Sequence, residues 1–216
     1  MDDTRQRILE VAGQTFAEKG FEEATVREIC QRAEANLAAV NYHFGDKAKL
    51  YVEAVKQAHC HQGGEIPEFP WTSETPPEQK LNDFIHHMMS MMLENDRPSW
   101  HLELMLREMS RPTEACTELV QSFIGPMFGT LQSILRELLP PGTPAEVVRL
   151  HGFSIVGQCL LYRYHRPIGR LLIGEEEFRQ LFQRVDRIAA HIVAFSLGGL
   201  RTAHQATAAP QGGDRA

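Results

Sequence analysis

The sequence lacks the features that define several large classes of protein. Its first residues carry two acidic side chains and no apolar run, which is the wrong start for a secretory signal peptide. The longest uncharged stretch near the C-terminus, residues 188–200, is shorter than the roughly 20 apolar residues that a membrane-spanning helix needs, and His191 interrupts it. We therefore expect a soluble cytoplasmic protein with no membrane partner.

Cysteine is scarce, and the 4 cysteines have no CxxC spacing. This excludes a disulfide framework and a zinc ribbon, and we expect the cysteines to be small buried residues. The group His59, Cys60 and His61, joined by His86 and His87, has side chains that suit zinc or copper. Adjacent helical residues point about 100° apart, so His59 and Cys60 do not easily share an ion. We predict neither a metal nor a cofactor.

Catalytic signatures are also missing. The sequence contains no GxSxG, HExxH, phosphate loop or dinucleotide fingerprint, and its 16 glycines are scattered. A helical enzyme remains an alternative, and a pH–rate profile that depends on His86 or His151 would support it. The net charge of −6 gives no global sign of nucleic-acid binding, so any case for DNA must rest on a local pattern.

What the sequence does contain is helical periodicity. Hydrophobic residues make up 43% of the chain and charged residues 23%, which is ordinary for a globular protein with a buried core. Apolar residues recur with a period of 3.6 and strand-like alternation does not persist, so we predict an all-α fold. We expect Gly20 to end the first helix with a left-handed cap, and Gly125 with Pro126 to kink a long one. The predicted helices span residues 4–19, 25–33, 38–44, 46–61, 78–95, 98–111, 113–139, 144–164 and 174–197.

A change in composition divides the chain. Residues 62–77 contain four prolines and two glycines, which cannot continue a helix. We therefore predict an N-terminal helical part over residues 1–61, a C-terminal helical bundle over residues 62–200, and a disordered tail over residues 201–216.

The bundle offers more apolar surface than one core needs. Gly152, Ser154 and Gly157 permit close helix approach, either within the chain or between two copies. The last predicted helix adds further apolar residues, namely Phe178, Phe182, Val185, Ile188, Ala189 and Ile192. A self-complementary four-helix interface would use this excess, so we expect a homodimer.

Residues 24–51 carry the pattern that indicates a binding function. Two short predicted helices joined by a tight turn are typical of a helix-turn-helix. Thr25 and Glu28 have the spacing of a capping box, and the Thr25 hydroxyl can also meet a phosphate. Ala38 and Ala39 place little between the backbone and the floor of a major groove.

The neighbouring polar residues suit DNA as well. The amide of Asn41 can donate to and accept from one adenine edge. Tyr42, His43, Lys47 and Lys49 are suited to phosphate oxygens, while Val40 and Phe44 are expected to face inward.

These residues resemble the N-terminal domain of the TetR/AcrR family of one-component transcriptional regulators. The similarity covers about residues 4–61, and is densest where T-V-R-E-I, A-A-V-N-Y-H-F and the following K-x-x-L occur. The resemblance implies a homodimer with a three-helix DNA-binding head and a C-terminal domain for effector binding and dimerisation. It implies phosphate contacts by Thr25, Tyr42, His43 and Lys47, base-facing positions at Arg27, Ala38, Ala39 and Asn41, and a further DNA-binding position at Asn36.

The C-terminal half resembles the CecR-like branch of this family. The resemblance rests on W-H-L-E-L-M-L-R-E at residues 100–108 and S-I-V-G-Q-C-L at residues 154–160. Members of the branch are linked to membrane export and drug tolerance. The Met-rich run at residues 88–92 is either plain core or an adaptable lining for an apolar or aromatic effector. Arg107 either forms a solvated pair with Glu108 or points inward beside Trp100 toward an anionic or aromatic ligand.

The candidate effector contacts are therefore spread over the predicted bundle. They are Met88, Met92, Trp100, Leu104, Arg107, Phe123, Phe128, Gln158 and Tyr162.

Three departures from the family pattern bear on DNA binding. Glu34 occupies a turn position where glycine is usual, so a left-handed backbone there would be strained. Leu37 replaces a polar or basic residue, and residues 1–61 contain 8 Lys and Arg against 10 Asp and Glu. We predict a repressor that binds a pseudo-palindromic double-stranded operator and is released by a small-molecule effector. The alternative is a protein-interaction adaptor on the same fold that has lost specific DNA binding.

Overall fold

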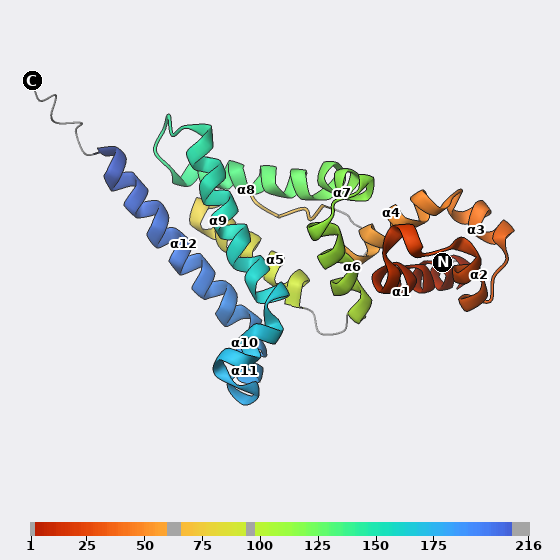
Figure 1. Ribbon diagram of the computed structural model, residues 1–216. Helices are drawn as coiled ribbons and strands as arrows, with labels where there is room; N and C mark the ends of the chain where they lie inside the picture. The colour runs from red at the N-terminus through yellow and green to blue at the C-terminus, as the bar shows by residue number, and fades with distance from the viewer. Residues whose placement is uncertain (1–2, 60–65, 94–97, 209–216) are drawn as a thin grey trace, which may run out of the picture. The chain divides into compact units, whose positions relative to one another are not determined.

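The computed structural model describes residues 3–59, 66–93 and 98–208, and all regular structure within these ranges is helical. The prediction of an all-α fold is confirmed. The helices form two compact units, coloured along the chain in Figure 1. The first unit contains Met1–Pro67 and Asn95–Pro126, and the second contains Glu68–Glu94 and Met127–Ala216. Among the described residues, no helix has both the length and the apolar character needed to cross a membrane.

The first unit packs seven helical elements around one core. Their bounds are α1 (Asp3–Glu23), α2 (Val26–Arg32), α3 (Leu37–Phe44), α4 (Lys47–His59), α6 (Ser99–Ser110), α7 (Glu114–Leu119) and the π-helical turn η1 (Val120–Ile124). Ile8, Phe16, Ile29 and Leu50 are fully buried in this core. Helix α1 bends at Gly20, where φ is 80°, so glycine occupies the positive-φ position predicted at the end of the first helix.

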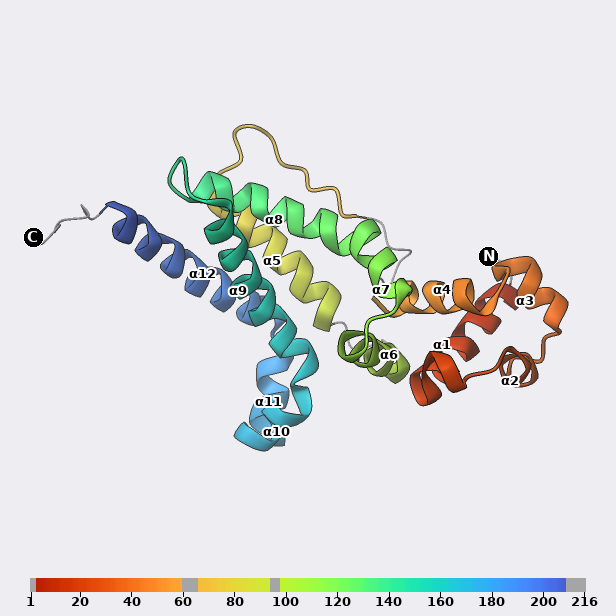
Figure 2. The same ribbon diagram turned by 45° about the horizontal axis from the view of Figure 1, so that its top comes forward.

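Hydrogen bonds join helix α6 to α1, although about 90 residues separate the bonded groups in the sequence. Trp100 Nε1 donates a 2.6 Å hydrogen bond to Glu10 Oε1, and the indole ring lies so close to Gly13 that a β-carbon there would overlap it. Arg107 donates to the carbonyl oxygens of Ala17 at 2.6 Å and Glu18 at 2.7 Å. Both carbonyl groups lie in the last turn before the bend at Gly20, and carbonyl groups at the end of a helix need such partners. Figure 2 shows α6 beside the other helices of this unit.

A buried carboxylate links α4, α6 and the start of α7. Glu108, 1% exposed, accepts hydrogen bonds from the Tyr51 hydroxyl at 3.1 Å and the Thr113 hydroxyl at 2.6 Å. The Thr113 backbone N–H donates to the same carboxylate at 3.3 Å. Burial, followed by the charge of Glu108 and the hydrogen bond to it, raises the pKa of Tyr51. The arrangement supplies partners for a charge that would otherwise be costly to bury.

The second unit is a helical bundle with a short helical hairpin. Its elements are α5 (Pro77–Leu93), α8 (Gly125–Leu138), α9 (Ala145–Tyr164), α10 (Arg166–Ile173), α11 (Glu175–Phe182) and α12 (Val185–Ala208); the first two residues of α8 belong to the first unit. Helix α12 packs along α5 and α9, as Figures 1 and 2 show. Leu81 and Ile85 of α5, Leu131 of α8 and Ile192 of α12 are completely buried in this unit.

The end of the chain differs from the predicted single helix over residues 174–197. Three helices, α10, α11 and α12, occupy residues 166–208. Gly174, with φ of 81°, separates the first two, and a turn at Gln183 and Arg184 separates the last two. Pro167 near the start of α10 was a helix-start signal that the periodicity reasoning missed.

Helix α12 also continues beyond residue 200, where the sequence predicted a disordered tail. It reaches Ala208, because residues 201–208 contain neither glycine nor proline and include three alanines, the best helix former. The prediction was therefore wrong for residues 201–208. Residues 209–216 lie outside the described residues.

The predicted kink in the long helix takes the form of a π-helical turn. The Gly125 N–H donates to the Val120 carbonyl, five residues earlier, and α8 begins at Gly125. Proline at position 126 has no N–H to donate, so the normal helical ladder is interrupted there. A β-carbon on Gly125 would lie 2.7 Å from the Val120 oxygen, so glycine is required by this close approach.

Cysteines 30 and 159 are buried, as predicted, and Cys116 is partly buried. Burial raises the pKa of the Cys159 thiol to about 12, which keeps it protonated. Cys60, together with His61 and the start of the predicted linker, lies outside the described residues.

Candidate nucleic-acid interface

Side-chain caps fix the starts of the two short helices. Thr25 Oγ1 accepts a 3.2 Å hydrogen bond from the Glu28 N–H at the start of α2. Asn36 Oδ1 accepts a 2.8 Å bond from the Ala39 N–H at the start of α3. The reciprocal half of the predicted capping box is replaced, because Glu28 forms a 2.6 Å ion pair with Lys19 instead. Both helix starts are thus set by contacts within three residues.

The turn between α2 and α3 holds Glu34 in a left-handed conformation. Glu34 has φ of 49°, the only positive value at a non-glycine residue in the described part of the chain. The Ala35 N–H donates to the Cys30 carbonyl at 2.9 Å, and Arg7 Nε donates to the Ala33 carbonyl at 2.8 Å. These bonds hold the turn in place, so the strain at Glu34 is imposed by its surroundings.

Helix α3 presents one buried and one exposed face. Val40 and Phe44 are buried, as predicted. Ala38, Asn41 and Tyr42 are exposed, with Tyr42 reaching 85%. Ala39 is half-buried, and Asn36 is exposed but uses its side-chain oxygen in the cap. The exposed face therefore carries the amide of Asn41 and the phenol of Tyr42 beside the methyl group of Ala38.

The predicted phosphate contacts lie around this face. Thr25, the N-cap of α2, is exposed, and its hydroxyl, which accepts from the backbone, still has its own proton to donate. Arg27, which was predicted to face the bases, is exposed on α2. His43 is half-buried, with its ring 5.0 Å from the Tyr42 ring. Lys47 Nζ donates to the Glu22 carbonyl at 3.2 Å and lies 4.5 Å from the Phe21 ring centre, which fixes its position.

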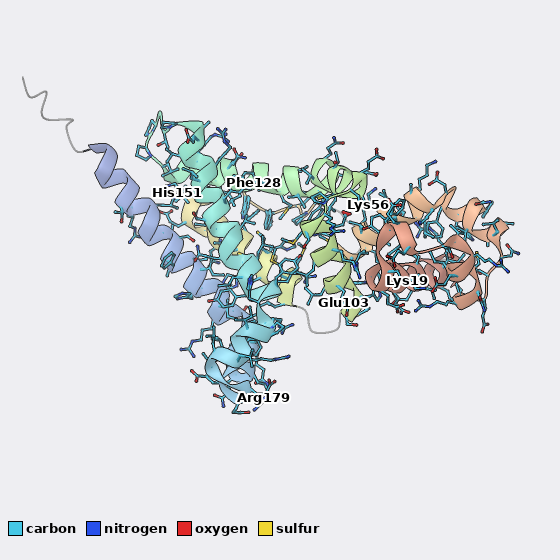
Figure 3. All side chains as sticks on the ribbon, viewed as in Figure 1. Lys19, Lys56, Glu103, Phe128, His151 and Arg179 are labelled. Atoms are coloured by element: carbon cyan, nitrogen blue, oxygen red, sulfur yellow. The ribbon has the colours of Figure 1, made fainter. Side chains whose placement is uncertain are left out.

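Residues 1–61 contain more acidic than basic side chains, but the basic side chains differ in whether a carboxylate pairs with them. Five cations are held in ion pairs with carboxylates of the same unit: Arg5 with Glu53, Arg7 with Asp3, Lys19 with Glu28, Arg32 with Glu18, and Lys56 with Glu118. Lys19 and Lys56 are labelled in Figure 3. Within residues 3–59, Arg27, Lys47 and Lys49 have no such carboxylate partner, and all three belong to α2 or the start of α4. Positive charge is therefore available beside α3.

The histidines near the end of α4 do not assemble a metal site in the described residues. The His59 ring packs on Phe123 at 5.2 Å, and no cluster of three potential ligands occurs in residues 3–59, 66–93 and 98–208. Cys60 and His61, which the metal hypothesis also used, are outside these ranges.

The candidate effector residues are divided between the two units. Trp100, Leu104 and Phe123 are buried in the first unit, where Arg107 bonds to the carbonyls of α1. The other five lie on α5, α8 and α9 of the second unit: Met88, Met92, Phe128, Gln158 and Tyr162. Four candidates thus belong to the first unit and five to the second, and the contacts of Trp100 and Arg107 join helices of the first unit.

The five residues of the second unit differ in exposure. Met88 is buried, whereas Met92, Gln158 and Tyr162 are partly exposed. The Phe128 ring, labelled in Figure 3, stacks on Phe153 at 5.0 Å and fills the space beside Gly152. The Gln158 amide donates to the Ser154 carbonyl at 3.2 Å.

One exposed residue of α3 is not among the predicted DNA contacts. Leu37 is 56% exposed at the first position of α3. The signal that identifies it is its place directly after the N-cap, because the first turn of a recognition helix enters the groove.

Comparison with known proteins gives two family matches along the chain. Residues 8–54 match bacterial regulatory proteins of the tetR family. Residues 77–200 match the C-terminal domain of the HTH-type transcriptional dual regulator CecR. The second match alone covers more than half of the 216 residues.

Individual relatives agree with these matches. The HTH-type transcriptional repressor AcnR of Corynebacterium efficiens is 30% identical over 98 residues, which are 45% of each chain, so the similarity spans about half the length of that relative. CecR of Shigella flexneri is 22% identical over 207 residues, covering 88% of this chain and 90% of CecR.

Solved structures show the same fold. The hemolysin II transcriptional regulator HlyIIR is 22% identical with a TM-score of 0.57, over 88% of this chain and 97% of that one. A TetR-like transcriptional regulator from Rhodococcus sp. RHA1 is 15% identical with a TM-score of 0.58, over 92% and 96% of the two chains. Together with the family matches, these findings show that the chain belongs to the TetR/AcrR family of transcriptional regulators, in its CecR-like branch.

Proposed function

We propose that this protein is a homodimeric, ligand-responsive repressor that binds a pseudo-palindromic DNA operator. The observation that carries the proposal is the exposed face of α3, on which Asn41 and Tyr42 stand beside Ala38 on a helix whose start is capped. A small residue allows the helix close to the groove floor, and an asparagine amide pairs with an adenine edge. Thr25 and Lys47 flank this face and are suited to phosphates, and Arg27, exposed on α2, is proposed to face the bases.

The dimer surface is proposed on the exposed sides of α9 and α12. Leu150, Phe153 and Leu161 are exposed along α9, with Gly157 open between them, and Phe195 is 66% exposed on α12. The spacing of three to four residues places the α9 positions on one stripe. Five of the residues first expected at this interface pack within the chain instead. Gly152 contacts the Phe128 ring, and the side chains of Phe178, Ile188, Ala189 and Ile192 are buried.

Two copies joined on such a stripe would present two α3 helices to one DNA molecule. A dimer with two-fold symmetry that binds B-DNA requires half-sites about 34 Å apart or slightly more. Sedimentation equilibrium of Leu161→Glu with Phe195→Glu tests the surface: we expect monomers, and an unchanged dimer would place the interface elsewhere.

The effector is proposed to be an apolar or aromatic small molecule that binds to the second unit. Met88, Met92, Phe128 and Tyr162, on α5, α8 and α9, offer adaptable apolar contacts, and Gln158 adds an amide. The chain passes between the two units three times, at residues 67–68, 94–95 and 126–127. An effector that binds one arrangement of the dimer more tightly would shift the population away from the DNA-binding arrangement.

The DNA-binding function is tested by fluorescence anisotropy. The full-length protein is used to select a duplex from a random library, and its affinity is compared with that for a scrambled duplex over a salt series. We expect selective binding with a negative log–log salt slope. Asn41→Ala with Tyr42→Phe should weaken binding by on the order of tenfold to a hundredfold per half-site, since one bidentate base contact is worth about 1–3 kcal/mol.

A matched double variant controls for general damage. Asn82→Ala with Tyr164→Phe makes the same chemical changes in the second unit, and should leave DNA affinity at the wild-type value. Weak binding to both duplexes without a salt slope would instead favour the adaptor, and full affinity in the Asn41 and Tyr42 variant would refute the proposed recognition face.

A further inference from the structure

The first residue of α3 is an exposed leucine at the end of the helix that is proposed to enter the groove. Leu37 is 56% exposed and directly follows the N-cap Asn36. Single exposed leucines are common on protein surfaces, so exposure alone means little. The position is what matters here, because the N-terminal residues of a recognition helix contact base edges.

The residues beside Leu37 indicate which bases this end of α3 can contact. Asn41 follows Leu37 by four residues and therefore lies on the same side of α3, one turn later. Ala38, beside it, is also exposed. Helix α3, residues 37–44, contains neither lysine nor arginine, the side chains that most often recognise guanine through its O6 and N7 atoms. Its groove-facing end thus offers apolar groups and one amide, which suit thymine and adenine.

Building on the proposed DNA-binding function, we propose that Leu37 determines specificity by contacting the C5 methyl group of a thymine in each half-site. The thymine methyl is the one apolar group on a major-groove edge. Four residues of helix advance about 6 Å along the axis, close to two base-pair steps of about 3.4 Å. The thymine therefore lies within about two base pairs of the adenine that Asn41 contacts.

The test removes the methyl group and the leucine separately. The duplex selected by the full-length protein is resynthesised with each thymine of both half-sites replaced in turn by deoxyuridine, which lacks only the methyl. For the wild type, we expect one thymine position near the Asn41-sensitive adenine to lose about fourfold in affinity per half-site, the value of one buried methyl group. Leu37→Ala should bind the thymine duplex more weakly and no longer distinguish thymine from uracil at that position.

Two further variants separate this contact from a general effect on the protein. Leu37→Met keeps an apolar side chain of similar size and should retain the preference for thymine. Leu171→Ala removes a leucine that is 87% exposed on α10, and should behave like the wild type on every duplex. Thermal unfolding of Leu37→Ala within a degree or two of the wild type shows that any loss of affinity is not a loss of folding.

The outcomes are distinguishable from those for the proposed function. A thymine preference that persists in Leu37→Ala overturns the inference, and so does the absence of any uracil-sensitive position in a duplex that still binds tightly; both leave the DNA-binding function standing. Failure to select any duplex overturns the proposed function, and the role of Leu37 with it.

Discussion

Replacing Glu34 by glycine should stabilise this protein, although the side chain is exposed. A left-handed backbone costs a residue with a β-carbon about 1–2 kcal/mol, and Glu34 has φ of 49°. Glycine avoids this cost but loses about 0.5–1 kcal/mol more conformational entropy on folding than alanine. Within the described residues, the Glu34 carboxylate has no hydrogen bond or ion pair to lose. The balance predicts that Glu34→Gly raises the free energy of unfolding by about 0.5–1 kcal/mol.

Urea denaturation followed by circular dichroism measures this difference. The protein concentration must be held constant, because association of two copies contributes to apparent stability. Thermal unfolding should show a midpoint about 1–4 °C higher for a chain of this length.

Glu34→Ala is the matched control, because it removes the same charge but keeps the β-carbon. Its free energy of unfolding should stay near or below the wild-type value. The DNA affinity of both variants should rise to a similar degree, by about twofold per half-site if a phosphate lies roughly 10 Å away. Equal stabilisation by alanine and glycine would show that charge, and not backbone strain, explains the effect, and a destabilised Glu34→Gly would refute the reasoning outright.

Two further predictions concern the contacts around α1 and α4. Gly13→Ala should destabilise the protein by about 1–3 kcal/mol in urea denaturation, because the new methyl group overlaps the Trp100 ring. Gly129→Ala, with open space around it, should be neutral or stabilising. Equal effects of the two substitutions would contradict the packing described. Burial and Glu108 raise the pKa of Tyr51, so the folded protein keeps a proton that the unfolded chain loses, and the free energy of unfolding should fall as pH rises past about 10. Tyr51→Phe should flatten this decline in urea midpoints measured between about pH 8 and 11, and an identical decline in both proteins would argue against a raised Tyr51 pKa.

The helix-turn-helix was predictable because its determinants are local. Thr25, Asn36 and Asp46 each cap a helix through a backbone N–H three residues later, and such signals are visible in a short window of sequence. The burial of Val40 and Phe44 likewise follows from their spacing on one face of α3.

The remaining errors arise where the determinants are distant or carry no local mark. Periodicity indicates that Trp100 is on an apolar face but does not identify its partner on α1, about 90 residues earlier. Local sequence also does not show that Arg107 donates to two carbonyl groups of α1 and not to a ligand, because those partners depend on the same tertiary placement. The turn at Gln183 and Arg184 contains neither glycine nor proline, so the division between α11 and α12 had no conventional signal.

The attachment of α6 to α1 has a consequence for exchanging DNA specificity between relatives. A chimeric regulator made by transplanting only residues 1–61 would separate Gly13 from the Trp100 ring and the α1 carbonyls from Arg107. The foreign α6 would have to match the transplanted α1 by chance. In this protein, the portable recognition module consists of two stretches of chain, Met1–Pro67 and Asn95–Pro126, which have to be transplanted together.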